Sequence, residues 1–364
     1  MKQLLMVFAI ILALCGLADA SDIQHQQADM LQTNVLEDAI PSEAKPFMKD
    51  VTPENSGDFF DKAVQILKDA VTLGLPSLKQ AGQTSARVLI SVLICTVTSI
   101  MASGAGRPAI RLLGVLAISL CCMGDYRSLV QASSGAIDDL NVFTTALLPV
   151  MAGATAATGA VTSSAALYAG SAFFLHSLIG IIQKFFVPVV HISLVVCIAD
   201  AALEQDTFRE IGNMLQGSVK TAMKLLLFSF SAFLSLTHIV SGNADALAVK
   251  AAKLTVSSVV PVVGGMLSDA TETILVSAKL LRNSVGVFGM LATLAILIVP
   301  FLKLGIQYLV LQGTTVLVSA IGEKEQTSVL RAISTATGLL LGMAVCCGFM
   351  AFLSCICFMK VTVM

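Results

Sequence analysis

The amino-acid sequence consists of one apolar segment after another from about residue 87 to its last residue. Hydrophobic residues make up 56% of the 364 residues and charged residues 12%, against about 25% charged residues in soluble domains. A soluble core does not need so much uninterrupted hydrocarbon, whereas a transmembrane helix needs about 20 largely apolar residues in a row. The pattern therefore predicts an all-α protein, a polytopic bundle of transmembrane helices.

The first residues are typical of a secretory signal peptide. Lys2 precedes an apolar run from Leu4 to Leu17, and the small residues Ala18 and Ala20 follow before a polar stretch. The run is too short to span a bilayer comfortably. We predict a cleaved signal peptide over residues 1–20. An uncleaved signal anchor is the alternative, and with either one the next segment starts outside the cytoplasm.

Residues 21–86 form the predicted extracytoplasmic segment. Three prolines punctuate its polar first half, which we expect to be loosely ordered. Its second half has apolar residues at helical spacing between Phe59 and Val71, with charged residues on the other side, which predicts an amphipathic helix. This helix could lie on the membrane surface or dock on a partner. Packing against the protein's own membrane domain is the simpler interpretation.

Residues 87–364 form the predicted membrane domain of eight to ten spans. Several of the ten spans that can be drawn are shorter than 18 residues, so they would need re-entrant or broken helices. With an exported start, the inner loops carry nine Lys and Arg residues and the outer loops six, which favours ten spans. The spans are about 88–103, 109–123, 142–161, 165–183, 185–203, 225–240, 254–268, 284–301, 304–321 and 337–359.

Two proline motifs recur at one offset. Leu147–Gly153 resembles Val259–Gly265, and Val187-Pro188 resembles Val299-Pro300, each 112 residues later in the chain. We infer two parallel copies of a four-span unit, as internal repeats are common in transporter folds. Chance similarity between apolar runs is the alternative. The predicted copies are residues 109–210 and 222–332.

The candidate site of the sequence lies around the proline–glycine motifs. Proline removes a backbone hydrogen bond and glycine permits close approach, which predicts a broken helix. Irregular backbone at membrane depth persists only inside protein or along a wet cavity. The charged residues that follow fall within about 140° of one helix circumference, so we predict a pore-lining or partner-binding surface. The alternative is an amphipathic helix at the cytoplasmic interface. The site residues are Pro149, Gly153, Pro261, Gly264, Gly265, Asp269, Glu272, Lys279, Arg282 and Asn283.

Signatures of catalysis are missing from the sequence. It contains no His-Glu-x-x-His, no glycine-rich phosphate loop ending in Lys-Ser/Thr and no Gly-x-Ser-x-Gly. Most of the nine cysteines lie in apolar runs, and no histidine accompanies the group at 346–357, which indicates packing residues rather than metal ligands. The net charge of −1 does not indicate the excess of basic residues that is typical of nucleic-acid-binding proteins. We therefore predict a protein that is not an enzyme, with no catalytic residues, metal site or cofactor.

Several motifs in order resemble one family of membrane proteins. They are Ser241-Gly242, Lys250-Ala-Ala-Lys253, the stretch from Ser257 to Glu272, and Asn283-Ser-Val-Gly286-Val-Phe-Gly289. The signal peptide, the segment from Ile40 to Asp50 and the run Leu147–Gly153 also fit. On these residues the chain resembles the stage III sporulation protein AE family of endospore-forming bacteria, over nearly its whole mature length.

The resemblance implies a function that composition and spacing do not show. Family members belong to a multiprotein complex in the mother-cell membrane around the forespore, which is similar to a secretion or feeding channel. That complex is needed for late forespore gene expression and forespore maintenance. The resemblance thus implies a multi-pass protein whose partners are other stage III sporulation proteins and the lipid bilayer, and it leaves a homo-oligomer open. The alternatives are a stand-alone secondary transporter of unknown solute and a non-conducting membrane scaffold.

Overall fold

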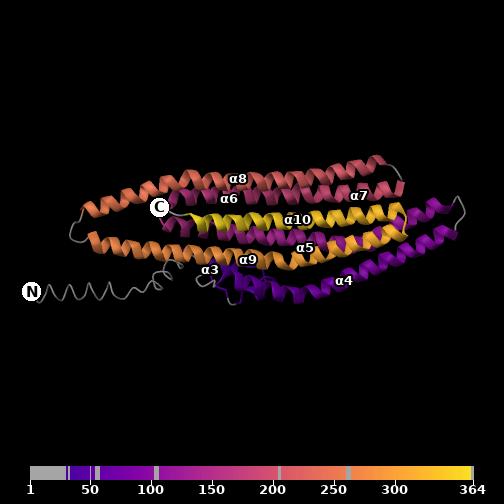
Figure 1. Ribbon diagram of the computed structural model, residues 1–364, viewed down its shortest axis with the longest axis horizontal. Helices are drawn as coiled ribbons and strands as arrows, with labels where there is room; N and C mark the ends of the chain where they lie inside the picture. The colour runs from indigo at the N-terminus through magenta and orange to yellow at the C-terminus, as the bar shows by residue number, and fades with distance from the viewer. Residues whose placement is uncertain are drawn as a thin grey trace, which may run out of the picture.

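The computed structural model describes residues 30–31, 33–49, 51–53, 58–101, 106–203, 206–259 and 264–361. Within these ranges the chain is helical and forms no strand, so the predicted all-α class is confirmed. Figure 1 shows the long helices side by side in one elongated bundle. The elements are α3 (Asn34–Asp38), the 3₁₀ helix η1 (Lys45–Met48), α4 (Phe59–Met101), α5 (Arg107–Ala157), α6 (Val161–Ile181), the π-helical turn η3 (Ile182–Phe186), α7 (Val187–Leu203), α8 (Asp206–Val259), α9 (Gly264–Ile321) and α10 (Lys324–Lys360).

Six helical segments of the described chain are long and apolar enough to cross a membrane. The multi-pass prediction is thereby confirmed, but the count of eight to ten spans is wrong for the described residues. Predicted spans join in pairs: α5 contains both 109–123 and 142–161, and α9 contains both 284–301 and 304–321. The six segments are Gly74–Met101, Arg107–Ala157, Val161–Leu203, Phe208–Thr237, Leu275–Ile321 and Lys324–Lys360.

Polar residues at mid-helix explain the wrong count. The interruptions that suggested loops lie inside continuous helices, where neighbouring helices satisfy them. The Asp125 carboxylate of α5 accepts a hydrogen bond of 2.9 Å from Gln80 Nε2 of α4. Lys303 Nζ of α9 donates to Ser128 Oγ of α5 at 3.0 Å. Such contacts between helices replace the hydrogen bonds to water that these polar side chains would make in a loop.

The helices are longer than a bilayer is thick. At 1.5 Å per residue, the 51 residues of α5 extend over about 76 Å and the 58 residues of α9 over about 87 Å. The hydrocarbon core of a bilayer is only about 30 Å thick. Each of these helices therefore continues well beyond the hydrocarbon of one membrane.

The core of the bundle lies along α10. This helix contacts α5, α6, α7, α8 and α9, and Figure 1 shows it between the α6–α8 side and the α5–α9 side. Its inward residues are wholly buried, among them Leu340, Met343 and Phe358. The π-helical turn η3 lets α6 and α7 continue as one rod, and the next residues include Pro188, which removes one backbone donor. Gly159, with a φ of 90°, makes the tight turn between α5 and α6.

The N-terminal elements pack on the bundle. Leu36 of α3 and Phe47 of η1 are buried, and these elements contact α5 and α9 respectively. The predicted amphipathic helix is the first part of α4, where Ile66 and Ala70 are buried against the bundle. Packing against the protein's own membrane domain is thereby confirmed. Because α4 is continuous to Met101, the predicted boundary near residue 87 lies inside a helix. Residues 1–20, the predicted signal peptide, lie outside the described residues.

The predicted repeat does not match these helices in its four-span form. Pro149 lies inside α5, whereas the corresponding Pro261 falls in residues 260–263, outside the described part, between the end of α8 and the start of α9. The turn at Gly159 corresponds, 112 residues later, to an interior position of α9. The predicted repeat therefore stays a similarity in sequence.

Candidate functional site

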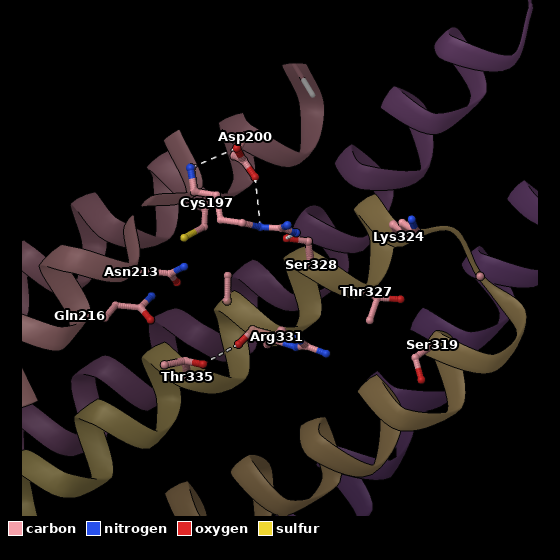
Figure 2. Close-up of a pocket in the computed structure, with 13 residues that line it drawn as sticks. Cys197, Asp200, Asn213, Gln216, Ser319, Lys324, Thr327, Ser328, Arg331 and Thr335 are labelled. Carbon is pink, nitrogen blue, oxygen red and sulfur yellow. Dashed lines mark hydrogen bonds and ion pairs between the residues drawn. The ribbon is translucent and has the colours of Figure 1, made fainter. Parts of the chain in front are cut away.

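A polar cavity of about 450 Å³ lies at one end of the bundle. At this end α7 and α9 finish and α8 and α10 begin, so side chains from four helices converge on it (Figures 1 and 2). Its walls carry three cationic side chains and one carboxylate, together with hydroxyl and amide groups. The lining residues are Cys197, Asp200, Arg209, Asn213, Gln216, Ser319, Gly322, Lys324, Thr327, Ser328, Arg331, Ala332 and Thr335.

The carboxylate of Asp200 organises one wall of the cavity. Asp200 is buried in the last turn of α7, and its Oδ1 accepts a hydrogen bond of 3.1 Å from the backbone N–H of Arg209 in the first turns of α8. Its Oδ2 lies 3.7 Å from Arg209 Nε (Figure 2). A negative charge at a helix N-terminus is stabilising. Asp200 therefore joins α7 to α8 as a cap and as an ion-pair partner.

Arg209 extends this connection to α10. Its Nη2 donates a hydrogen bond of 3.0 Å to Ser328 Oγ. Lys324 and Arg331 of α10 also line the cavity, and both side chains are exposed. Since Asp200 balances only one of the three cations, the cavity is electropositive.

A second set of charges closes the same end of the bundle. Arg111 of α5 pairs with Glu323, at 3.0 Å from Nε to Oε2, and Ser99 of α4 donates a hydrogen bond of 2.7 Å to the same carboxylate. Glu323 also forms a capping box with Gln326 at the start of α10. Three helices thus meet on one carboxylate beside the cavity, which fixes the position of α10.

The arrangement is suited to binding an anion. The described part of the chain contains no group of three His, Cys, Asp or Glu side chains that could hold a metal ion. The carboxylate of Asp200 is engaged as a cap and a salt-bridge partner. Exposed guanidinium and ammonium groups beside hydroxyls are suited to bind anionic or hydroxylated groups by hydrogen bonds.

Replacing Asp200 by alanine should lower the free energy of unfolding by about 1–3 kcal/mol, because α8 loses its cap and Arg209 its charged acceptor. Thermal unfolding of the full chain in detergent measures this change. Asp69→Ala is the matched control, since Asp69 is exposed on α4. Equal unfolding temperatures for the two variants would show that the Asp200 contacts do not stabilise the fold.

The two predicted site residues on α5 lie near its end. Pro149 is exposed, and α5 continues through it to Ala157, so the predicted helix break does not occur there. Gly153 is covered by the N-terminal segment: a Cβ on this glycine would lie 2.6 Å from Leu31 Cδ2. The close approach that glycine permits is therefore made by Leu31 of the same chain.

The predicted site residues on α9 divide between surface and interior. Lys279 and Asn283 are exposed, whereas Arg282 is only 4% exposed and donates a hydrogen bond to the carbonyl oxygen of Val361, just after α10. Arg282 therefore satisfies a carbonyl at the C-terminal end of α10, where a cation is favourable. Arg282 therefore has a structural role, and its side chain is not part of an exposed binding surface.

Four further site residues lie in the first turns of α9, and one precedes it. Pro261 is outside the described residues. Gly264, Gly265, Asp269 and Glu272 belong to the helical backbone of α9, but their side chains are outside the described part. Further along α9, a Cβ on Gly286 would meet Met359 of α10 and Met151 of α5, so the three helices lie together at that level.

The cavity residues were not singled out from the sequence. In the sequence, Arg209, Lys324 and Arg331 stand out only through the Lys and Arg bias of the predicted inner loops. Asp200 is an ionisable residue close to the end of a predicted span. The predicted grouping of basic residues in the inner loops was the signal that could have found the site, because α8 and α10 both begin at this end of the bundle (Figure 1).

Comparison with known proteins gives one family. The family model described as stage III sporulation protein AE matches residues 43–362. The stage III sporulation protein AE of Bacillus subtilis (strain 168) is 23% identical over 188 residues, which cover 52% of this chain and 47% of the relative. The match thus spans about half the length of that relative. No solved structure matches the chain.

Proposed function

Because the chain belongs to the stage III sporulation protein AE family, we propose that it is an integral component of the secretion-like channel complex between mother cell and forespore. The match over residues 43–362 carries this proposal. With six apolar helices among its described residues, the chain is a multi-pass membrane protein of a sporulation family. Its role is to keep the engulfed forespore intact and to sustain late forespore gene expression.

The proposed place of the protein is the mother-cell membrane around the forespore. Its N-terminal segment lies outside the cytoplasm, in the space between the two membranes, and α3 and η1 of that segment dock on the bundle. Its partners are other proteins of the stage III complex, and it assembles there with further copies of itself. Exposed Pro149, Lys279 and Asn283 belong to the surface that contacts them.

The packing of a single chain supports a role within an assembly. Large aromatic side chains fill the bundle: Phe143, Phe230, Phe288 and Phe358 are all fully buried. A conduit through one such bundle would require these side chains to separate, with a large loss of packing. The filled interior therefore favours a component that acts with neighbours over a stand-alone transporter.

Deleting the gene in the spore-forming bacterium that encodes it should stop development after engulfment. We expect forespores to be engulfed normally, then to lose late reporter expression and collapse, and a chromosomal copy of the full chain to restore both. Time-lapse fluorescence with a late forespore reporter measures this. Normal maturation of the deletion strain would overturn the proposal.

A further inference from the structure

A second groove, of about 800 Å³, lies between α8, α9 and α10. It differs from the polar cavity, with which it shares only Arg331 and Thr335, in having a basic part and an apolar part. The residues that line it are Lys220, Met223, Lys224, Leu227, Tyr308, Gln312, Arg331, Thr335, Gly338, Leu339, Leu341, Gly342, Val345, Cys346 and Phe349.

The basic part of the groove carries three cations and no carboxylate. Lys220 and Lys224 lie one turn apart on one face of α8, and Arg331 lies on α10. All three side chains are exposed, and none has a carboxylate partner within the part of the chain that the structure describes. This end of the groove is therefore complementary to an anion.

Neutral polar groups stand beside the three cations. Gln312 donates a hydrogen bond of 3.2 Å from Nε2 to the Tyr308 hydroxyl. The hydroxyl of Thr335, one turn after Arg331 on α10, also lines the groove. Hydroxyl and amide groups of this kind bind the ester oxygens and hydroxyls of a phospholipid headgroup.

The floor of the groove is one face of α10. The residues Arg331, Thr335, Gly338, Gly342 and Val345 recur every three or four positions, as residues on one face of a helix do. The two glycines have no side chain, so the face is hollowed between its basic and apolar parts.

The apolar part continues from the basic part along the same helix face. Val345 is 43% exposed and Phe349 52% exposed, and Leu227 of α8 lines the opposite wall. Exposed apolar side chains of this size on a hollowed face are suited to cover an acyl chain. A free phosphate ion would leave this part of the groove empty.

The two lysines of the groove stand where α8 changes from charged to apolar sequence. Residues 225–244 of α8, 283–302 of α9 and 332–359 of α10 contain no Asp, Glu, Lys or Arg. Twenty helical residues extend over about 30 Å, the thickness of the hydrocarbon core. Lys224 directly precedes the stretch of α8. Met223 of α8 faces Gly342 of α10, so Lys220 and Lys224 lie beside the start of the apolar part of the groove, and Arg331 lies about three turns nearer the start of α10.

We propose that this groove binds an anionic phospholipid, with its phosphate on Lys220 and Lys224, the rest of its headgroup directed toward Arg331, and an acyl chain along Val345 and Phe349. Basic pockets between transmembrane helices bind acidic lipid headgroups by the same chemistry. A bound lipid would fill the hollow between α8 and α10 and hold the two helices together.

The test uses the full chain in phosphatidylcholine nanodiscs that contain phosphatidylglycerol. Binding is measured with a fluorescent phosphatidylglycerol and by mass spectrometry of the lipid that remains after detergent extraction. The triple variant Lys220→Gln, Lys224→Gln, Arg331→Gln should weaken phosphatidylglycerol binding about a hundredfold. The matched control, Lys79→Gln, Arg127→Gln, Lys184→Gln, removes three exposed cations that do not line the groove and should bind as the parent does.

Competition measurements distinguish a lipid from other anions as the ligand of the groove. Inorganic phosphate, glycerophosphoglycerol and a polyglutamate peptide should each fail to displace the fluorescent lipid at concentrations where phosphatidylglycerol displaces it. The double variant Val345→Ser, Phe349→Ser should reduce retained lipid while leaving the cations in place. The proposal is overturned if the triple variant of the groove binds phosphatidylglycerol as tightly as the triple control variant does. It is also overturned if any of the anions without an acyl chain displaces the fluorescent lipid as well as phosphatidylglycerol does, or if the double variant retains as much lipid as the parent chain.

Discussion

Gly289→Leu is expected to lower the free energy of unfolding by about 3 kcal/mol or more, since inserting bulk into a close-packed core forces side chains and backbone to shift. Gly289 of α9 lies where three helices meet. A Cβ at this position would stand 2.9 Å from both Cδ atoms of Leu147 on α5 and 3.2 Å from Cys355 Sγ on α10. A leucine side chain has no free volume there, because the residues around it are buried.

Gly313→Leu in the same helix is the matched control. Nothing lies within 4 Å of a Cβ at Gly313, which is exposed. Leucine is a better helix former than glycine by up to about 1 kcal/mol, so the control should be neutral or stabilising. Thermal unfolding in detergent, with retention of helical circular dichroism before the transition, measures both variants. Equal unfolding temperatures would contradict the three-helix contact of α5, α9 and α10.

This contact also matters for the proposed assembly. It lies on the half of the bundle that carries Lys279 and Asn283, which we assign to the partner surface. A shift of α9 against α10 would move these residues relative to Pro149 on α5. Gly289→Leu, expressed as the sole copy during sporulation, is therefore expected to impair forespore development even where some protein still reaches the membrane.

Fold class was predictable from the sequence because it depends on composition over long windows. Long apolar stretches with few charges indicate a lipid environment, where a helix satisfies the hydrogen bonds of its own backbone. The helical spacing of apolar residues likewise predicted the amphipathic start of α4, where Ile66 and Ala70 recur on the buried face. These features are local, so no knowledge of neighbouring helices was needed.

Span boundaries were not predictable because they depend on tertiary contacts. Lys303 looks like a loop residue in sequence, yet it lies within α9 and donates to Ser128 of α5. Asp125 similarly accepts a hydrogen bond from Gln80 across two helices. A hydropathy pattern records the polar residue but not the partner that lets the helix continue.

The candidate cavity was hidden for a related reason. Asp200 and Arg209 are nine residues apart but belong to two helices. Arg331 comes more than a hundred residues later in a third helix, so no spacing rule connects the three. Only the order of the helices brings their ends together. The proline–glycine motifs, by contrast, were visible as patterns, but Pro149 lies in an unbroken helix. Propensity at a single residue was outweighed there by the packing of the whole helix.

The most direct test of the six-helix bundle is the side of the membrane on which Ala157 lies. Six helices place Ala157, at the end of α5, and Lys324, at the start of α10, at opposite ends of the bundle. Ten spans would place both on the cytoplasmic side. Both side chains are exposed, so a cysteine at either position is open to reagents.

Ala157→Cys and Lys324→Cys are therefore to be labelled with a membrane-impermeant maleimide in sealed right-side-out vesicles, with the parent chain as the background for its native cysteines. We predict that one of the two positions reacts in intact vesicles and that the other reacts only after permeabilisation. Because the N-terminal segment is proposed to lie outside the cytoplasm, the position that reacts first should be Ala157→Cys. Protection of both positions until permeabilisation would contradict the six-helix bundle.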